Sequence, residues 1–352
     1  MPRVRSLPKG PHGRILSLAH RSTVLRDNPW QDPCDRTLHV YLPPAYDESG
    51  PPLVALWDLA AFANTGPGHL NWRHHGENLP QRLDRLIHAG LLPPVVVPMP
   101  DCYTSLGGNQ YLNSAAVGAY ADYIVAELVP FLSRHVNVID GRSGRGVFGK
   151  SSGGYGALCL AMDYPGTWGA AASHAGDVGF DLVYRPKFPV AASRLQSCDG
   201  DILNFLRDFW GSRKRGRADY ATLISVAMAA SYDPDPERPE RIRLPFDLRT
   251  CALDDARWAR WQAQDPLNRV TRQVDELRSL HALYFDVGDR DEYNIQFGTR
   301  NLSRELEKLG VRHHFEEFEG GHSQLDWRLD HSLPYIARAL YEAGTETESK
   351  HD

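Results

Sequence analysis

Residues 149–153 read Gly-Lys-Ser-Ser-Gly and match the pattern G-x-S-x-G, with Ser151 at the serine position. In this pattern the serine sits on a sharp strand-to-helix turn, and small residues two places before and after it let the backbone fold back without a clash. A short apolar strand at 146–148 precedes the turn, and a helix of small residues at 153–162 follows it. The context predicts Ser151 as a nucleophile, the alternative being a glycine-rich turn that buries a serine.

A serine nucleophile needs a base to remove its proton and a carboxylate to orient that base. In proteins with this turn, the chain order is serine, then acid, then histidine. Downstream of Ser151, a predicted strand at 282–286 ends in a cluster of acidic residues. Asp291 lies in the loop that leaves this strand and is our predicted acid, with Asp289 and Glu292 as rivals.

The predicted base is His322, which follows two glycines directly after a predicted strand at 313–318. The two glycines permit a tight turn that brings the imidazole back toward the edge of the sheet. A histidine in a surface loop is the alternative. Because the three groups occur in the expected order and after the expected elements, we predict a triad of Ser151, Asp291 and His322.

Strands and helices alternate along most of the chain, and several strands are short unalternating apolar runs. Such runs are typical of strands buried on both faces of a parallel sheet. The alternation implies right-handed crossovers and an α/β fold with a mostly parallel, doubly wound sheet in a single domain, 1–352. The predicted strands are 37–42, 53–57, 95–97, 146–148, 169–173, 282–286 and 313–318, and the predicted helices are 79–89, 115–132, 153–162, 299–309 and 331–341.

Residues 177–281 interrupt this alternation before the last two strands, and the segment is too long for one crossover helix. Helical patterns occur at 202–209, 220–230 and 254–264, and a stretch rich in proline and charge occupies 233–243. We expect a helical insertion that lies like a lid over the carboxyl edge of the sheet.

The composition is that of an ordinary globular protein, with 42% hydrophobic residues, 24% charged residues and a net charge of −5. This charge gives no reason to expect nucleic acid or an anionic membrane as a partner. The chain has no run of about 18 apolar residues, so we expect no transmembrane helix. The N-terminus has no apolar segment typical of a secretory signal, and five widely spaced cysteines favour free thiols in the cytoplasm. A homo-oligomer is compatible with the sequence.

A cluster of His69, His74, His75 and Glu77 raises the question of a metal site. Its spacing matches no known paired-ligand pattern, so we expect no metal there. The chain also has no phosphate-cradling loop and no dinucleotide fingerprint, and we therefore expect no organic cofactor.

The chain resembles the putative-esterase family of α/β hydrolases, which includes esterase D (S-formylglutathione hydrolase), enterochelin esterases, feruloyl esterases and mycolyltransferases. The resemblance runs from about residue 37 to residue 340, interrupted by the insertion. It implies the α/β-hydrolase fold, with Ser151 as nucleophile, Asp291 as acid and His322 as base. It rests on G-K-S-S-G-G-Y-G at 149–156, G-D-R-D at 288–291, G-G-H-S at 320–323 and L-G-G-N-Q-Y-L-N-S at 106–114.

Two backbone amides hold the oxyanion in this family. The amide of Ser152, directly after the nucleophile, is predicted as the first. The second amide follows what is counted as the third strand in this family, usually in a loop that begins His-Gly or Ser-Gly; the corresponding strand here is the predicted strand at 53–57. Here that place reads Trp-Asp-Leu-Ala at 57–60 without the glycine, so Leu59 matches best and Ala60 is the alternative.

Substrate contacts are expected from the loop at 103–114 and from the end of the strand at 169–173. The candidates are Gln110, Tyr111, Asn113 and His174, and for each a structural hydrogen bond is the alternative. The predicted chemistry is hydrolysis of a small-molecule carboxylic ester or thioester through an acyl-enzyme. The alternatives are an acyltransferase that uses the same triad with an alcohol acceptor, and a binding protein without catalysis.

Overall fold

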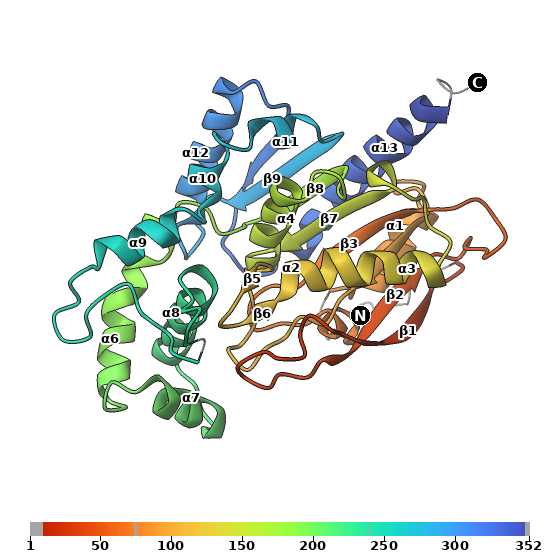
Figure 1. Ribbon diagram of the computed structural model, residues 1–352. Helices are drawn as coiled ribbons and strands as arrows, with labels where there is room; N and C mark the ends of the chain where they lie inside the picture. The colour runs from red at the N-terminus through yellow and green to blue at the C-terminus, as the bar shows by residue number, and fades with distance from the viewer. Residues whose placement is uncertain (1–9, 74–75, 239, 349–352) are drawn as a thin grey trace, which may run out of the picture.

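A computed structural model describes residues 10–73, 76–238 and 240–348. Within these residues the chain forms an eight-stranded sheet with the order β1-β2-β4-β3-β7-β8-β9-β10 (Figure 1). The strands are β1 (Arg14–Arg21), β2 (Asp35–Leu42), β3 (Val54–Leu59), β4 (Val95–Met99), β7 (Arg145–Lys150), β8 (Ala170–His174), β9 (Ala282–Gly288) and β10 (His314–Phe318).

Six strands run parallel to one another, which confirms the predicted mostly parallel sheet. In sheet order they are β4, β3, β7, β8, β9 and β10. Strand β2 is antiparallel to β4, and β1 is antiparallel to β2. The sequence analysis did not predict β1. Its residues alternate between exposed and half-buried because it is the edge strand, and it therefore lacks the apolar run that marks the inner strands.

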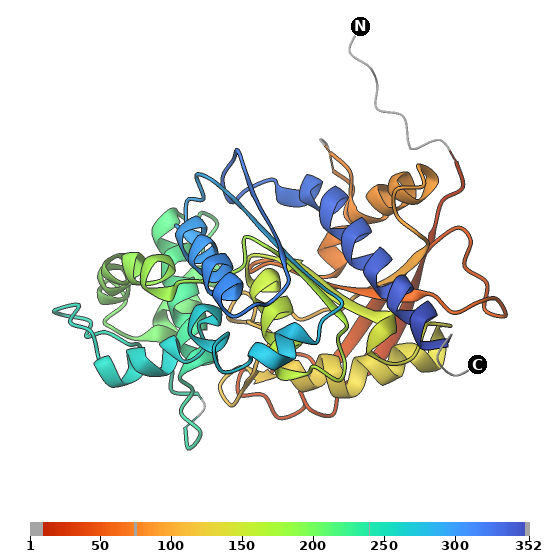
Figure 2. The same ribbon diagram turned by 90° about the horizontal axis from the view of Figure 1, so that it is seen from above.

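Helices cover both faces of the sheet, as the apolar runs predicted (Figure 2). In β3, Val54 and Leu56 share one core cluster with residues of α1 (Leu79–His88) and α13 (Leu329–Glu348). Their neighbours Ala55 and Trp57 face the other cluster, which includes residues of α3 (Val129–His135) and α4 (Ser152–Asp163). Successive side chains of a strand point to opposite faces of the sheet. Where helices cover both faces, the side chains on each face must therefore be apolar.

The helix predicted over 115–132 begins later and is irregular. Strands β5 (Asn113–Ser114) and β6 (Gly118–Ala119) form a small hairpin that includes Gly118 at φ +133°. The helix then runs through α2 (Tyr120–Asp122), a π-helical segment (Tyr123–Leu128) and α3. Pro130, near the start of α3, has no amide to donate to the preceding turn, which explains why regular hydrogen bonding is interrupted there.

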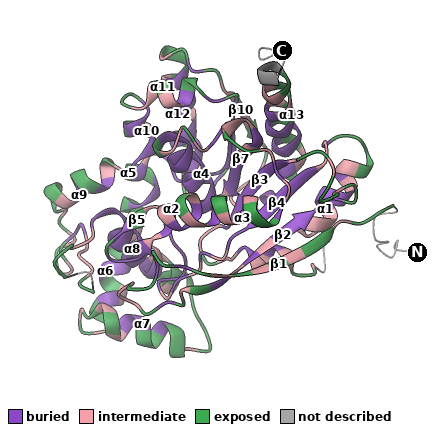
Figure 3. Ribbon diagram, turned by 45° about the vertical axis from the view of Figure 1, so that its right-hand side comes forward, coloured by how far each residue is buried: buried purple, intermediate pink, exposed green. Residues whose placement is uncertain are grey.

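The segment 177–281 leaves the sheet at β8 and returns at β9, which pairs directly with β8. Its larger helices form a group beside the sheet, and they carry exposed outer faces over a buried interior (Figures 1 and 3). Its helices are α5 (Phe180–Val183), α6 (Phe188–Gln196), α7 (Ile202–Gly211), α8 (Arg217–Tyr232), α9 (Asp255–Gln262), α10 (Pro266–Arg269) and α11 (Val274–Arg278), and α12 (Ile295–Lys308) follows β9.

Candidate active site

Ser151 occupies the turn between β7 and α4 with φ 54° and ψ −122°, a conformation that non-glycine residues rarely adopt. The two glycines of the motif permit the close approach of the flanking backbone. A Cβ atom on Gly149 would lie 2.5 Å from the carbonyl carbon of Gly153. A Cβ atom on Gly153 would lie 2.0 Å from the Leu59 carbonyl oxygen. The turn therefore requires glycine at both positions.

The structure brings together the three residues of the predicted triad. The His322 Nε2 atom lies 2.9 Å from the Ser151 Oγ atom, and its Nδ1 atom lies 2.7 Å from Asp291 Oδ2. Asp291 is buried, and its other oxygen accepts the Tyr293 amide at 2.8 Å. A neutral imidazole that donates from Nδ1 to Asp291 has Nε2 free to accept the Ser151 proton.

The two rival acids support the turn that carries the histidine instead of contacting its ring. Asp289 Oδ1 accepts the Gly320 amide at 2.9 Å. Glu292 Oε2 accepts the backbone amide of His322 at 2.6 Å. Both carboxylates therefore hold the backbone around the imidazole, whereas Asp291 alone of the three hydrogen-bonds with the ring.

A second serine–histidine–aspartate arrangement lies inside the fold. His174 Nδ1 is 2.8 Å from Asp286 Oδ1, and its Nε2 is 2.9 Å from Ser332 Oγ. All three residues are at most 1% exposed. Burial would raise the pKa of Asp286, but His174 and Arg328 outweigh it and lower the pKa. His174 thus does not line the cavity at Ser151, which corrects the expectation of a substrate contact there.

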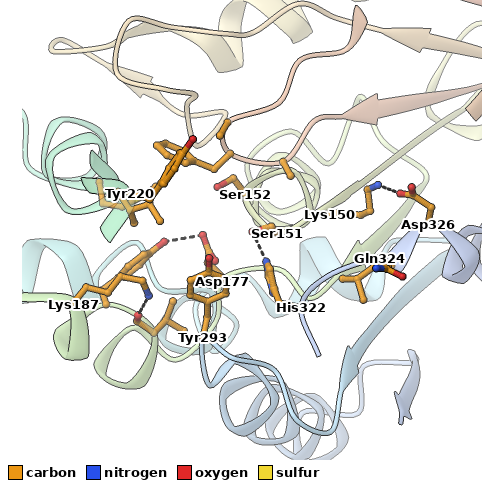
Figure 4. Close-up of a pocket in the computed structure, with 18 of the residues that line it drawn as sticks. Lys150, Ser151, Ser152, Asp177, Lys187, Tyr220, Tyr293, His322, Gln324 and Asp326 are labelled. Atoms are coloured by element: carbon orange, nitrogen blue, oxygen red, sulfur yellow. Dashed lines mark hydrogen bonds and ion pairs between the residues drawn. The ribbon is translucent and has the colours of Figure 1, made fainter. Parts of the chain in front are cut away.

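Ser151 and His322 open into a cavity of about 420 Å³ (Figure 4). The cavity wall combines apolar and charged side chains. Lys187, Asp177, Tyr220 and Tyr293 lie on one side of Ser151, and the Lys150–Asp326 ion pair lies on the other. The lining residues are Ala61, Phe62, Ala63, Arg73, Lys150, Ser151, Ser152, Asp177, Val183, Tyr184, Lys187, Tyr220, Ile224, Met228, Tyr293, His322, Gln324, Leu325 and Asp326.

The three candidate contacts from the loop at 103–114 do not line this cavity. Gln110 is buried, and its amide donates to Ser152 Oγ at 3.0 Å. The Tyr111 hydroxyl donates to the Ala60 carbonyl at 2.6 Å, and the Asn113 side chain accepts the Asp122 amide at 3.0 Å. The structure therefore places these side chains in structural hydrogen bonds, the alternative that the sequence left open.

The predicted oxyanion donors lie on either side of the turn. Ser152 lines the cavity and begins α4, so its amide is one of the unpaired donors of a helix N-terminus. Leu59 is the last residue of β3 and pairs with Gly149 of β7. Its carbonyl oxygen and that of Ala60 both lie against Gly153. Leu59 and Ala60 thus run beside the turn, and both oxyanion donors stay predictions.

The charged residues Lys187 and Asp326 of the cavity wall were absent from the predicted site, whereas Asp177, just after the strand at 169–173, was weighed as a substrate contact with a loop hydrogen bond as the alternative. Asp326 pairs with both Lys150 and Arg73. Burial raises the pKa of Asp177, and burial lowers the pKa of Lys187 to about 8. Lys187 and Asp326 follow no motif in the chain, so no sequence signal could have identified them as cavity residues.

Of the four residues considered for metal binding, the structure describes His69 and Glu77, and both bind other side chains. His74 and His75 lie outside the described residues. His69 hydrogen-bonds with Asp58, and Glu77 accepts from Arg85 at 2.9 Å. Within residues 10–73, 76–238 and 240–348, no group of three or more histidine, cysteine, aspartate or glutamate side chains is placed to hold a metal.

All five cysteines have free thiols. None of the helices in the described part of the chain combines the length and the apolar character needed to span a bilayer.

Comparisons with known proteins add the family context. A family model described as "Putative esterase" matches residues 32–334. No curated protein matches the chain. Similar solved structures include a ferulic acid esterase with 19% identity and a TM-score of 0.59, covering 94% of this chain and 100% of that one.

Two further structures cover similar shares of the chain. A fluorophosphonate-binding serine hydrolase of Staphylococcus aureus has 17% identity and a TM-score of 0.55, covering 94% of this chain and 98% of its own. An S-formylglutathione hydrolase from Agrobacterium tumefaciens has 18% identity and a TM-score of 0.55, covering 95% and 98%. With the family match, these likenesses confirm the α/β-hydrolase fold.

Proposed function

Because this chain belongs to the Putative esterase family and is an enzyme of the serine carboxylesterase type, we propose that it cleaves carboxylic esters or thioesters through an acyl-enzyme on Ser151. The observation that carries the proposal is the hydrogen-bonded series Ser151–His322–Asp291, which opens into a cavity through its serine and histidine. The buried Ser332–His174–Asp286 arrangement has the same atom order but cannot meet a substrate.

In the proposed mechanism, His322 accepts the Ser151 proton as Oγ attacks the ester carbonyl. The negative charge that develops on the carbonyl oxygen is held by the Ser152 amide and by a second amide, that of Leu59 or Ala60. The alcohol or thiol leaves with the proton from His322. Water activated by His322 then releases the acid, while Asp291 stabilises the imidazolium in both half-reactions.

We further propose that segment 177–281 acts as a cap within a single domain. Helix α8 supplies Tyr220, Ile224 and Met228 to the cavity wall, and Lys187 lies directly before α6. The apolar side chains of this segment share one core cluster with those of the sheet. Substrate selection therefore depends largely on residues of the cap.

The Ser151→Ala variant tests the nucleophile. We expect it to lose p-nitrophenyl acetate hydrolysis by a factor of about 10³ or more and to lose labelling by a fluorophosphonate, with unchanged thermal unfolding. The matched control is Ser193→Ala, which removes a hydroxyl from the exposed surface of α6. Retained labelling of the Ser151→Ala variant would contradict the assignment.

A second experiment, on the wild-type protein, separates hydrolysis from transfer to an alcohol. With glycerol or methanol added during turnover, a hydrolase releases mainly the free acid, whereas an acyltransferase releases mainly the new ester. The product ratio, measured by chromatography, identifies which acceptor the acyl-enzyme prefers.

A further inference from the structure

Lys187 is a cation of the cavity wall that forms no ion pair with any carboxylate of the described residues. Its ammonium donates to the Val183 carbonyl, and in the described part of the chain no ion pair joins it to a carboxylate. The other two cations of the wall, Lys150 and Arg73, both pair with Asp326. Among the cations of the described cavity wall, Lys187 is therefore the lysine or arginine that forms no ion pair.

The position of this ammonium is defined by aromatic rings. Its Nζ atom lies 4.7 Å from the centroid of the Tyr293 ring and 5.7 Å from that of Tyr184. Tyr293 in turn stands edge-on to the His322 imidazole, with ring centroids 4.7 Å apart and an interplanar angle of 81°. The cation is thus held on the cavity wall with a single ring between it and the proposed catalytic base (Figure 4).

Asp177 lies on the same side of the cavity, and neutral donors bind one of its two carboxylate oxygens. Its Oδ2 atom accepts the Tyr184 hydroxyl at 2.8 Å and the Gln110 amide at 3.4 Å. Burial raises the pKa of Asp177 and lowers that of Lys187 to about 8, although the nearby Asp177 and Asp291 favour the charged lysine. At neutral pH the ammonium remains mostly charged while it is partly withdrawn from water.

An ammonium that is partly withdrawn from water and forms no ion pair gains a charge-assisted hydrogen bond when an anion approaches. The remaining wall near the nucleophile includes apolar side chains of Phe62, Ile224 and Met228, which suit a short hydrocarbon chain. The cavity thus offers a nucleophile, an apolar wall and a separate positive charge.

We propose that Lys187 binds a carboxylate carried by the substrate, so that the preferred substrates are short esters with a free carboxylate on one arm. This inference rests on the proposed esterase function. The carboxylate belongs either to the acyl arm, as in a monoester of a dicarboxylic acid, or to the alcohol arm, as in an ester of a hydroxy acid. Both arms present the same group to Lys187.

The test compares two pairs of esters of matched length. Monomethyl glutarate and methyl pentanoate differ by a carboxylate on the acyl arm, and 4-acetoxybutanoate and butyl acetate differ by a carboxylate on the alcohol arm. The measured quantity is the ratio of kcat/KM for the anionic ester to that for its neutral partner. For the wild-type protein we expect this ratio to exceed ten in one of the two pairs, which identifies the arm.

Variants at the lysine assign the preference to its charge. Lys187→Met keeps the chain length and removes the charge, and it should lower the ratio tenfold or more. Lys187→Arg keeps the charge and should restore most of the preference. The matched control is Lys308→Met, which removes the same charge from the exposed surface of α12 and should leave the ratio unchanged.

A ratio near one in both pairs, or a ratio that Lys187→Met does not alter, would overturn the inference while ester hydrolysis stands. If no ester is hydrolysed, the proposed function fails, and binding still tests the subsite. Titration calorimetry of glutarate monomethyl ester into the Ser151→Ala variant should then show binding that Lys187→Met weakens tenfold or more. Equal binding to the Ser151→Ala variant with and without the Lys187→Met substitution would refute the role of Lys187.

Discussion

Gly153 lies directly against the carbonyl oxygen of Leu59, where an added Cβ atom would be 2.0 Å from that oxygen. Both groups belong to rigid elements, the first turn of α4 and the end of β3, so neither can yield. We therefore expect Gly153→Ala to lower the free energy of unfolding by about 3 kcal/mol and to reduce ester hydrolysis by displacing Ser151. Chemical denaturation and kcat measure the two effects.

The control for this substitution is Gly166→Ala. Gly166 has no atom within 4 Å of its added Cβ and does not adopt a positive φ. The change should alter the free energy of unfolding by less than about 1 kcal/mol. If Gly153→Ala lowered the free energy of unfolding no more than this small amount, the turn would tolerate a side chain at position 153.

The acid of the triad can be identified by comparing three amide substitutions. Asp291→Asn should reduce kcat by a factor of about 10⁴, because an amide next to Nδ1 favours the wrong imidazole tautomer. Glu292→Gln should reduce kcat by no more than about tenfold, since its side-chain oxygen can still accept the His322 amide. Asp289→Asn keeps an acceptor for the Gly320 amide and should also have a small effect.

Thermal unfolding of the three proteins is the accompanying control. If Asp289→Asn or Glu292→Gln reduced kcat as much as Asp291→Asn at equal stability, the assignment of Asp291 as the acid would be wrong.

The two histidines with serine and aspartate partners should respond differently to substitution. His174→Gln breaks a fully buried network and should lower the free energy of unfolding by about 2–4 kcal/mol. His322→Gln leaves most of the fold intact but should lower kcat by about 10³ or more. Thermal unfolding and kcat, measured for both variants, separate the structural role from the catalytic one.

A large loss of kcat in folded His174→Gln protein would contradict the structural role. Full activity of His322→Gln would contradict the assignment of the base.

The hydrogen-bonded grouping of Ser151, Asp291 and His322 was predictable because each residue lies in a turn or loop after a strand, and the carboxyl ends of parallel strands meet at one edge of the sheet. The same reasoning misplaced His174. This residue also ends a strand, yet its side chain enters the fold toward Asp286 and Ser332. Position at a strand end predicts proximity to the site, but the direction of a side chain depends on packing.

Lys187 and Asp326 were not predictable for a different reason. Lys187 reaches the cavity from segment 177–281, and Asp326 reaches it from the short helix Leu325–Arg328 after His322. Their partners are distant in the chain, as in the pairing of Asp326 with Arg73. The edge strand β1 was missed because one-sided burial leaves it without an apolar run.

The last prediction concerns Glu127, which attaches the end of β1 to the helical layer. Its carboxylate accepts the Thr23 amide at 2.8 Å, the Val24 amide at 3.1 Å and a His20 ring nitrogen at 3.2 Å. Burial would raise the pKa of Glu127, but hydrogen bonds from Ser22, Thr23 and His20 outweigh burial and lower it to about 2.

A carboxyl whose pKa is lowered in the folded state stabilises the fold above its unfolded pKa of about 4.5 and loses that contribution as the pH falls toward 2. Glu127→Gln should therefore lower the free energy of unfolding by about 1–3 kcal/mol at pH 7. The difference from the wild-type protein should shrink at pH 3. Urea unfolding at the two pH values measures it.

Glu48→Gln is the matched control, because Glu48 is mostly exposed and its ion pair with Arg14, at 3.7 Å, lies at the surface. Its effect at pH 7 should stay below about 0.5 kcal/mol, since exposed ion pairs contribute little. If the difference between Glu127→Gln and the wild-type protein were the same at pH 7 and pH 3, the carboxylate charge would not be what stabilises this attachment. The loss would then come from the altered hydrogen bonds alone.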